Sequence, residues 1–156
     1  MNKFMKKKLL IFLLIILVAG YIGLFVLNKQ SSDEQTIELV FPDCQKKYFA
    51  KVADTPVKRA IGFSNKTKIM EDEAIIFIFD EERILHFWMK DTYVPLDIIF
   101  LDENKKVVNF FNMTPCLEKN CPIYSSLKKA KYAIEIKSGS LSCLKNGMEV
   151  KFDLDN

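Results

Sequence analysis

Alternating hydrophobic and polar positions dominate the chain after residue 35. Near the end of the chain, for example, Ile134 and Ile136 alternate with Glu135 and Lys137. Successive side chains of a strand point to opposite faces of a sheet, so a period of two predicts half-buried β-strands. We expect about eight strands, over residues 36–41, 47–52, 74–79, 84–89, 97–101, 106–113, 131–137 and 148–152.

Two segments depart from this alternation. Residues 74–79 (AIIFIF) are apolar throughout, which is typical of a strand covered on both faces. Residues 54–63 favour a short helix, because Asp54 can cap it and Pro56 fits its first turn. A second helical turn is expected over residues 140–145. The predicted fold class is therefore mainly β (α+β), a single bent or barrel-like mixed sheet with one or two short helices.

The segment before this domain has a different pattern. Residues 9–27 contain nineteen residues without a charge, an amide or a proline. As a helix rising about 1.5 Å per residue, the segment would span roughly 28 Å, close to the hydrocarbon thickness of a bilayer. We expect residues 9–27 to be a transmembrane anchor, an uncleaved signal. A cleaved signal peptide is the alternative, with Val18-Ala19-Gly20 as its processing site, and it would release a secreted domain.

Lysines set the expected topology. Residues 1–8 carry four lysines and no acidic residue, whereas only Lys29 follows the apolar segment closely. The positive-inside rule then keeps residues 1–8 in the cytoplasm and puts the rest of the chain outside. Residues 28–35 are polar and are expected to form a linker to an extracytoplasmic domain, residues 36–156.

The charge balance argues against a nucleic-acid partner. The whole chain has 23 basic and 20 acidic residues, a net charge of +3. Outside the first 35 residues, 18 basic and 18 acidic residues remain. The excess of positive charge therefore belongs to the N-terminal segment and offers no binding surface for phosphates.

All four cysteines lie in the part expected outside the cytoplasm. An even number of cysteines in an exported domain favours disulfides. Cys116 and Cys121 are close in sequence, which leaves Cys44 and Cys143 as the second pair. Free thiols and a four-cysteine zinc site remain as alternatives, although no two cysteines have the spacing of a zinc knuckle. With a single histidine in the chain, we expect no metal and no cofactor.

The densest group of chemically capable residues is LHFWMKDTYVPLD, residues 85–97. On a strand, His86 and Trp88 share one face. We expect Asp97 and Arg59 to join them in one partly exposed cleft for a small polar ligand with an apolar flank. The alternative roles are structural. Trp88 would cover the core, His86 would bond a backbone carbonyl, Asp97 would cap a turn, and Arg59 would be solvated or pair with a carboxylate.

Four segments carry a resemblance to a known family: VADTPVKRAIGF, EDEAIIFIFDEERILHFWMKDTYVPLDIIFLDENKKVV, CPIYSS and NGMEVKF. Over about residues 46–154 the chain resembles the domain of unknown function family 192. The resemblance implies a compact, often exported β-rich domain of bacteria and archaea, and it implies no activity. The chain departs from the family pattern at Phe63-Ser64, where leucine-methionine is usual, and at Asp91, where asparagine is usual.

Two classes of function follow from these observations. The first is a binding module for a small polar ligand or a cell-envelope component, with the membrane as its other partner. The alternative is an envelope-associated hydrolase or transferase that uses Asp97, His86 and Arg59. A deep pocket that holds these three residues together would favour the enzyme, and a shallow aromatic groove would favour binding.

Overall fold

The computed structural model describes residues 8, 11–18, 20–21 and 35–154. The chain divides into two units, residues 1–34 and residues 35–156. Residues 11–18 of the first unit are helical, with exposed side chains. Within the described ranges, no helix has the length and apolar character that a membrane crossing requires. Much of the predicted anchor at residues 9–27, the basic tail up to residue 7 and residues 28–34 of the linker lie outside the described residues.

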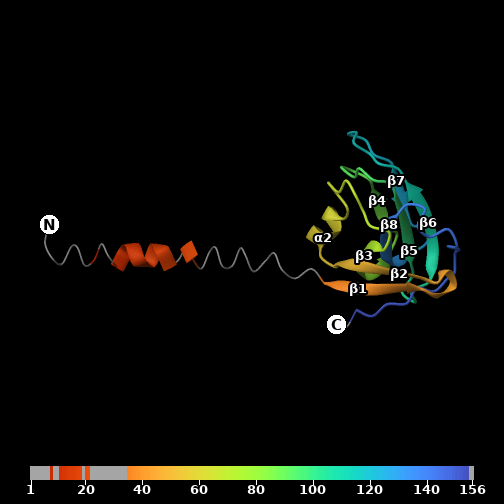
Figure 1. Cartoon of the computed structure of the whole chain (residues 1–156), viewed down its shortest axis with the longest axis horizontal. Helices are drawn as coiled ribbons and strands as arrows, with labels where there is room; N and C mark the ends of the chain where they lie inside the picture. The colour runs from red at the N-terminus through yellow and green to blue at the C-terminus, as the bar shows by residue number, and fades with distance from the viewer. Residues whose placement is uncertain (1–7, 9–10, 19, 22–34, 155–156) are drawn as a thin grey trace. The chain divides into compact units, whose positions relative to one another are not determined.

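The second unit contains eight strands in two sheets (Figure 1). Six strands form the large sheet, in the spatial order β1 (Thr36–Phe41), β2 (Lys46–Ala53), β3 (Glu73–Arg83), β8 (Ala130–Lys137), β5 (Leu96–Leu101) and β6 (Val107–Met113). Only the β2–β3 pair is parallel. The remaining two strands, β4 (His86–Trp88) and β7 (Ile123–Ser125), form a short antiparallel ribbon. This mainly β architecture confirms the predicted class.

The large sheet has an apolar core on each face. The first core gathers β1, β2 and the C-terminal segment against alternate residues of the central strands, and it includes Leu39, Tyr48, Ile76, Ile99, Ile134 and Phe152. The second core contains the intervening residues of the same strands, and it includes Phe63, Ile75, Phe77, Met89, Ile98 and Phe100. Because β3, β5 and β8 contribute to both cores, β3 is apolar without alternation, as the sequence predicted.

The C-terminal segment, residues 148–152, links the two edges of the large sheet. Val40 of β1 and Lys151 exchange backbone hydrogen bonds of 2.8 and 2.9 Å. On the opposite edge, Val107 of β6 donates a backbone hydrogen bond of 2.8 Å to Met148. The segment makes isolated bridges instead of the predicted eighth strand, and the described strands do not close a barrel. The sheet is curled around the first core.

Helix α2 (Pro56–Ile61) begins one residue later than the sequence predicted. Thr55 is the cap, since its Oγ1 accepts a hydrogen bond of 3.2 Å from the Lys58 N–H. Asp54 instead pairs with the Lys58 ammonium at 2.9 Å. The helix predicted at residues 140–145 is wrong, because turns occupy this segment. Its Cys143 and Ser140 are tied to η1 (Pro42–Cys44) and β2, which holds the segment against the first core.

Two disulfides join the cysteines in the pairs expected from the sequence. Cys44 of η1 is bonded to Cys143, 99 residues away, and Cys116 is bonded to Cys121. No free cysteine remains among the described residues. The first bond fastens the C-terminal segment to the start of the sheet, and the second closes the loop before β7.

We predict unequal effects of removing the two disulfides. A disulfide limits the unfolded chain more when it closes a longer loop. Replacing Cys44 and Cys143 together by serine should lower the free energy of unfolding by about 5 kcal/mol, and the same change at Cys116 and Cys121 by about 2 kcal/mol. Urea unfolding of both double variants without reductant measures the difference. Equal losses would contradict the loop-length argument.

Candidate functional site

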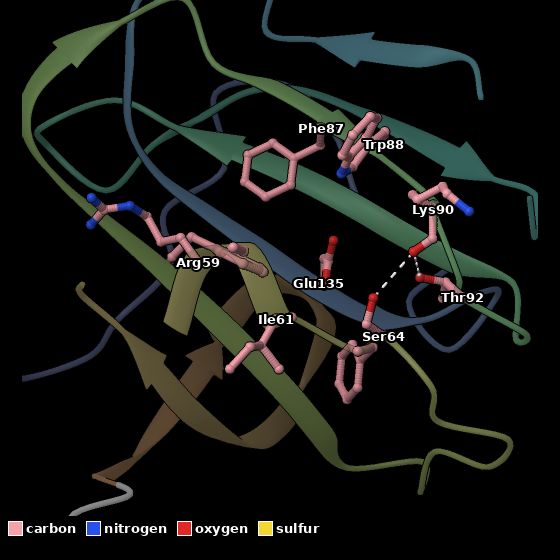
Figure 2. Close-up of a pocket in the computed structure, with 12 residues that line it drawn as sticks. Arg59, Ile61, Ser64, Phe87, Trp88, Lys90, Thr92 and Glu135 are labelled. Carbon is pink, nitrogen blue, oxygen red and sulfur yellow. Dashed lines mark hydrogen bonds between the residues drawn. The ribbon is translucent and has the colours of Figure 1, made fainter. Parts of the chain in front are cut away.

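A pocket opens on the side of the second core, where α2, β4 and β8 approach one another (Figure 2). Its volume is about 40 Å³, which is room for roughly three water molecules. Aromatic and polar side chains line most of it, namely Arg59, Phe63, Ser64, Phe77, Phe87, Trp88, Lys90, Thr92 and Glu135. An aromatic cavity with a few polar groups is the usual composition of a small-molecule site.

Glu135 of β8 forms the floor of this pocket. Its directly paired neighbours in the sheet are Ile75 of β3 and Ile98 of β5, so its strand neighbours offer no polar side chain. The residue is 5% exposed, and no hydrogen bond or neighbouring charge among the described residues contributes to the pKa shift of its carboxyl group. Burial raises the pKa of Glu135 to about 8, because the ionised form loses its solvation. At neutral pH the empty pocket therefore presents a mostly protonated carboxyl.

Gly62 allows the chain to pass over this carboxyl. Its φ angle is +47°, a region that residues with a Cβ rarely adopt. A Cβ at this position would also lie 3.4 Å from Oε2 of Glu135 and 3.4 Å from the Phe77 ring. The close packing of the end of α2 on the floor of the pocket therefore requires a glycine at position 62.

Strand β4 supplies the aromatic wall. Phe87 points inward and packs edge-on against Phe77, with ring centres 4.8 Å apart. Trp88 points the other way and is 60% exposed at the rim, with Ile123 of β7 as its cross-strand neighbour. The ribbon is fixed at its base, where Leu85 N–H donates to the Ser126 hydroxyl at 3.0 Å. An exposed tryptophan is thereby held in a defined place.

The segment after β4 closes one side of the pocket. Ser64 Oγ donates a hydrogen bond of 3.1 Å to the Lys90 carbonyl, as Figure 2 shows. Lys90 and Thr92 each form a bridge to Cys116, so the Cys116–Cys121 loop supports this wall from outside. Between them Asp91 has a left-handed φ of 55°, a conformation that aspartate and asparagine tolerate better than most residues. Aspartate in place of the usual asparagine therefore keeps the same backbone conformation at this position.

Arg59 lines the pocket but does not direct its charge into it. Its Nη1 donates hydrogen bonds to the carbonyls of Asp54 at 2.6 Å and Ile78 at 2.8 Å. The guanidinium also lies 4.8 Å from the centre of the Phe79 ring. Figure 2 shows it pointing away from Glu135. Arg59 therefore fastens α2 to β3 and leaves the carboxyl without a counter-charge.

The cleft predicted for Arg59, His86, Trp88 and Asp97 does not gather all four residues. Arg59 and Trp88 line the pocket, and the other two do not. His86 shares the outer face of the ribbon with Trp88, as predicted from the strand period, but its Nδ1 is paired with Ser125 Oγ at 2.7 Å. It lies beside the pocket.

Asp97 lies on the opposite face of the large sheet. Its neighbours Leu96 and Ile98 belong to the second core, so the alternation of β5 turns Asp97 toward the other side. Its carboxylate accepts hydrogen bonds from Gly139 N–H at 2.9 Å and Ser138 Oγ at 3.1 Å. Asp97 therefore caps the turn after β8, which was the structural alternative.

Sequence reasoning missed Glu135. The alternation in residues 131–137 made it a solvent-facing position of a half-buried strand. A signal was present, because Ala130, Ala133 and Ile134 make both faces of this strand apolar around it. This signal was outweighed, because glutamate is mostly exposed and Lys131 and Lys137 lie on the same face of the strand.

Comparisons with known proteins identify the fold but assign no activity. The model of the family DUF192, described as "Uncharacterized ACR", matches residues 39–152. No curated protein matches the chain. A Sinorhizobium meliloti 1021 structure, titled a "putative transcription regulator", is 23% identical with a TM-score of 0.68, over 76% of this chain and 93% of that one.

A protein of unknown function from Novosphingobium aromaticivorans DSM 12444 is equally similar. It is 23% identical with a TM-score of 0.67, and the match covers 76% of this chain and 84% of that one. At this identity the two structures show a shared fold alone.

We predict that Glu135 makes the stability of the domain depend on pH. An unfolded glutamate ionises near pH 4.5, whereas the folded one holds its proton to about pH 8. Stability from this group is complete below pH 4.5 and is lost as the pH rises to 8, by on the order of a few kcal/mol. Glu135→Gln removes this dependence. The free energy of unfolding of the variant, relative to that of the wild type, should therefore increase between pH 5 and 8.

Urea unfolding at several pH values measures this effect. Glu81→Gln is the matched control, because Glu81 is an exposed residue of β3. Its stability should follow the wild type at each pH. Parallel curves for Glu135→Gln and the wild type would mean that the carboxyl ionises normally.

Proposed function

The chain belongs to the DUF192 family, and from that premise we propose that it is an extracytoplasmic binding module for a small ligand, anchored in the cytoplasmic membrane by its N-terminal segment. The pocket between α2, β4 and β8 is the proposed binding site. Its ligand is a small polar compound, or the exposed end of an envelope component, with an apolar flank.

One observation carries this proposal, namely a buried carboxyl without a partner beneath an exposed tryptophan. A buried polar group that forms no hydrogen bond destabilises a fold, and an apolar residue at Glu135 would fit the second core better. Perturbed, desolvated groups in clefts are characteristic of functional sites. Trp88 adds a large exposed apolar surface, and covering it with a ligand would contribute favourable free energy of binding. A ligand that binds the carboxyl and covers the indole would satisfy both residues.

Binding is favoured over catalysis by the composition of the pocket. The enzyme alternative needs Asp97, His86 and Arg59 to act together, and only Arg59 lines the pocket, with its guanidinium turned away. The Ser64 hydroxyl is bonded to a backbone carbonyl, and no histidine lies beside it to activate it. Glu135 is the only carboxylate among the lining residues. Acid–base chemistry with two carboxylates has no second partner here.

Export is supported by the cysteines and the N-terminal charges. Both disulfides suit an oxidising compartment. The four lysines of residues 1–8, followed by the apolar residues 9–27, favour an anchor with its N-terminus in the cytoplasm. A cleaved signal would lead to the same compartment without the anchor.

We predict that Trp88→Ala lowers the affinity for ligands, whereas Asp97→Ala lowers the stability of the fold. A fragment screen on the purified full-length chain, read by ligand-detected NMR, supplies the ligands. Trp88→Ala should weaken their binding about five- to thirtyfold, since one aromatic contact contributes roughly 1–2 kcal/mol, and it should leave stability nearly unchanged. Asp97→Ala should lower the free energy of unfolding by about 2 kcal/mol, because it loses the hydrogen bonds from Gly139, Ser138 and Asn112. It should leave affinity unchanged, because Asp97 lies outside the pocket. Ligands whose affinity is unchanged by Trp88→Ala would contradict binding in this pocket.

We further predict the location of the domain. A reporter that is active only outside the cytoplasm, fused after Asn156, should be active. The chain should keep its full mass and remain in the membrane after alkaline washing. A reporter active only in the cytoplasm would refute export, and a mass loss of about twenty residues would identify a cleaved signal.

A further inference from the structure

We propose that the pocket recognises a cationic group, an ammonium or a guanidinium, whose apolar flank covers Trp88. This inference rests on the proposed function of the pocket and names the chemical class of its ligand. It follows from the carboxyl at the floor, the rings around it and the placement of the nearby charges.

The carboxyl of Glu135 lacks a counter-charge. Two cationic residues line the pocket, and both are engaged elsewhere. The Arg59 guanidinium binds the carbonyls of Asp54 and Ile78. The Lys90 ammonium lies 2.7 Å from Oδ1 of Asp91, and Figure 2 shows it directed away from Glu135. The strand neighbours on β3 and β5 are isoleucines. A cation from outside would supply the missing partner.

The walls favour the same class of ligand. Phe63, Phe77, Phe87 and Trp88 surround the space above the carboxyl. The faces of aromatic rings attract cations, and tryptophan does so most strongly. An anionic ligand would meet the carboxyl with no free cation among the lining residues to hold it. The rings and the carboxyl therefore act together on a positive charge.

The size of the pocket limits what enters. A volume of about 40 Å³ accepts an ammonium group and one or two carbons, roughly the space of three waters. The rest of the ligand must lie at the rim, where Trp88 offers its exposed indole. The structure thus fits an amphipathic amine, with its charged end inside and a flat or apolar part against the tryptophan.

Binding of a cation is coupled to a proton. Burial raises the pKa of Glu135 to about 8, so at neutral pH the empty pocket holds a protonated carboxyl. When an ammonium binds, the carboxyl O–H bond breaks, the proton passes to the buffer, and the carboxylate pairs with the cation. Affinity for the cation should therefore rise with pH up to about pH 8. A neutral ligand would bind the protonated carboxyl and release no proton.

Titration calorimetry of the full-length chain with benzylamine and benzyl alcohol tests this proposal. The two probes share a ring and differ in charge, and benzylamine stays protonated over the pH range used. Comparing phosphate with HEPES, a buffer that has no primary ammonium to compete for the site, gives the number of protons released. We expect benzylamine to bind at least tenfold more tightly than benzyl alcohol at pH 7.5. Its affinity should increase severalfold between pH 6.5 and 7.5, with close to one proton released.

Variants separate the possible outcomes. Glu135→Gln should lose at least tenfold in benzylamine affinity and release no proton, while Glu81→Gln, the exposed control, should bind like the wild type. If benzyl alcohol binds as tightly as benzylamine and the binding requires Trp88, the cation proposal is overturned and the binding function stands. If neither probe binds in a way that Trp88→Ala weakens, both proposals fail.

Discussion

The burial of the three central strands on both faces determines the rest of this structure. β3, β8 and β5 carry apolar side chains in both directions, so each face of the sheet must be covered. The chain covers the first face by curling β1, β2 and the C-terminal segment over it. It covers the second face with α2, the turn that follows it and the β4–β7 ribbon. The first face is covered more completely than the second, because a curled sheet packs continuously while a short helix and a two-stranded ribbon leave a gap.

The pocket is this gap, and its chemistry depends on the strand beneath it. Helix α2 has only six residues, none of them fully buried, and cannot cover the sheet alone. Phe87 fills part of the space by packing on Phe77 and Phe100. What remains is centred on Glu135, the one charged residue among the buried positions of β8. The pocket over Glu135 remains open because neither the helix nor the ribbon is long enough to cover it.

Period-two alternation predicted seven of the strands and the mainly β class, because it reflects a geometric property of each strand alone. It did not predict the short β7, and it predicted a strand at residues 148–152, which make only isolated bridges. The cysteine pairs followed from nearness in sequence and from elimination. The site needed information that no single strand contains. Asp97 was expected beside Trp88 because a turn at residues 91–92 would fold its strand back beside the His86–Trp88 strand. In β5, however, its neighbours Leu96 and Ile98 face the second core, so the Asp97 side chain points to the other face. Glu135 was taken as solvated because the alternation of residues 131–137 does not reveal that β8 lies between β3 and β5.

The bridging of both sheet edges by residues 148–152 has a consequence for how the chain is made. A ribosome delivers β1 before this segment, so the two edges cannot be joined, nor Cys44 matched with Cys143, until residues 143–152 have been made. During elongation the first core lacks Val150 and Phe152, two of its buried residues. The first core can therefore close only after residues 148–152 have been made, which is after all eight strands.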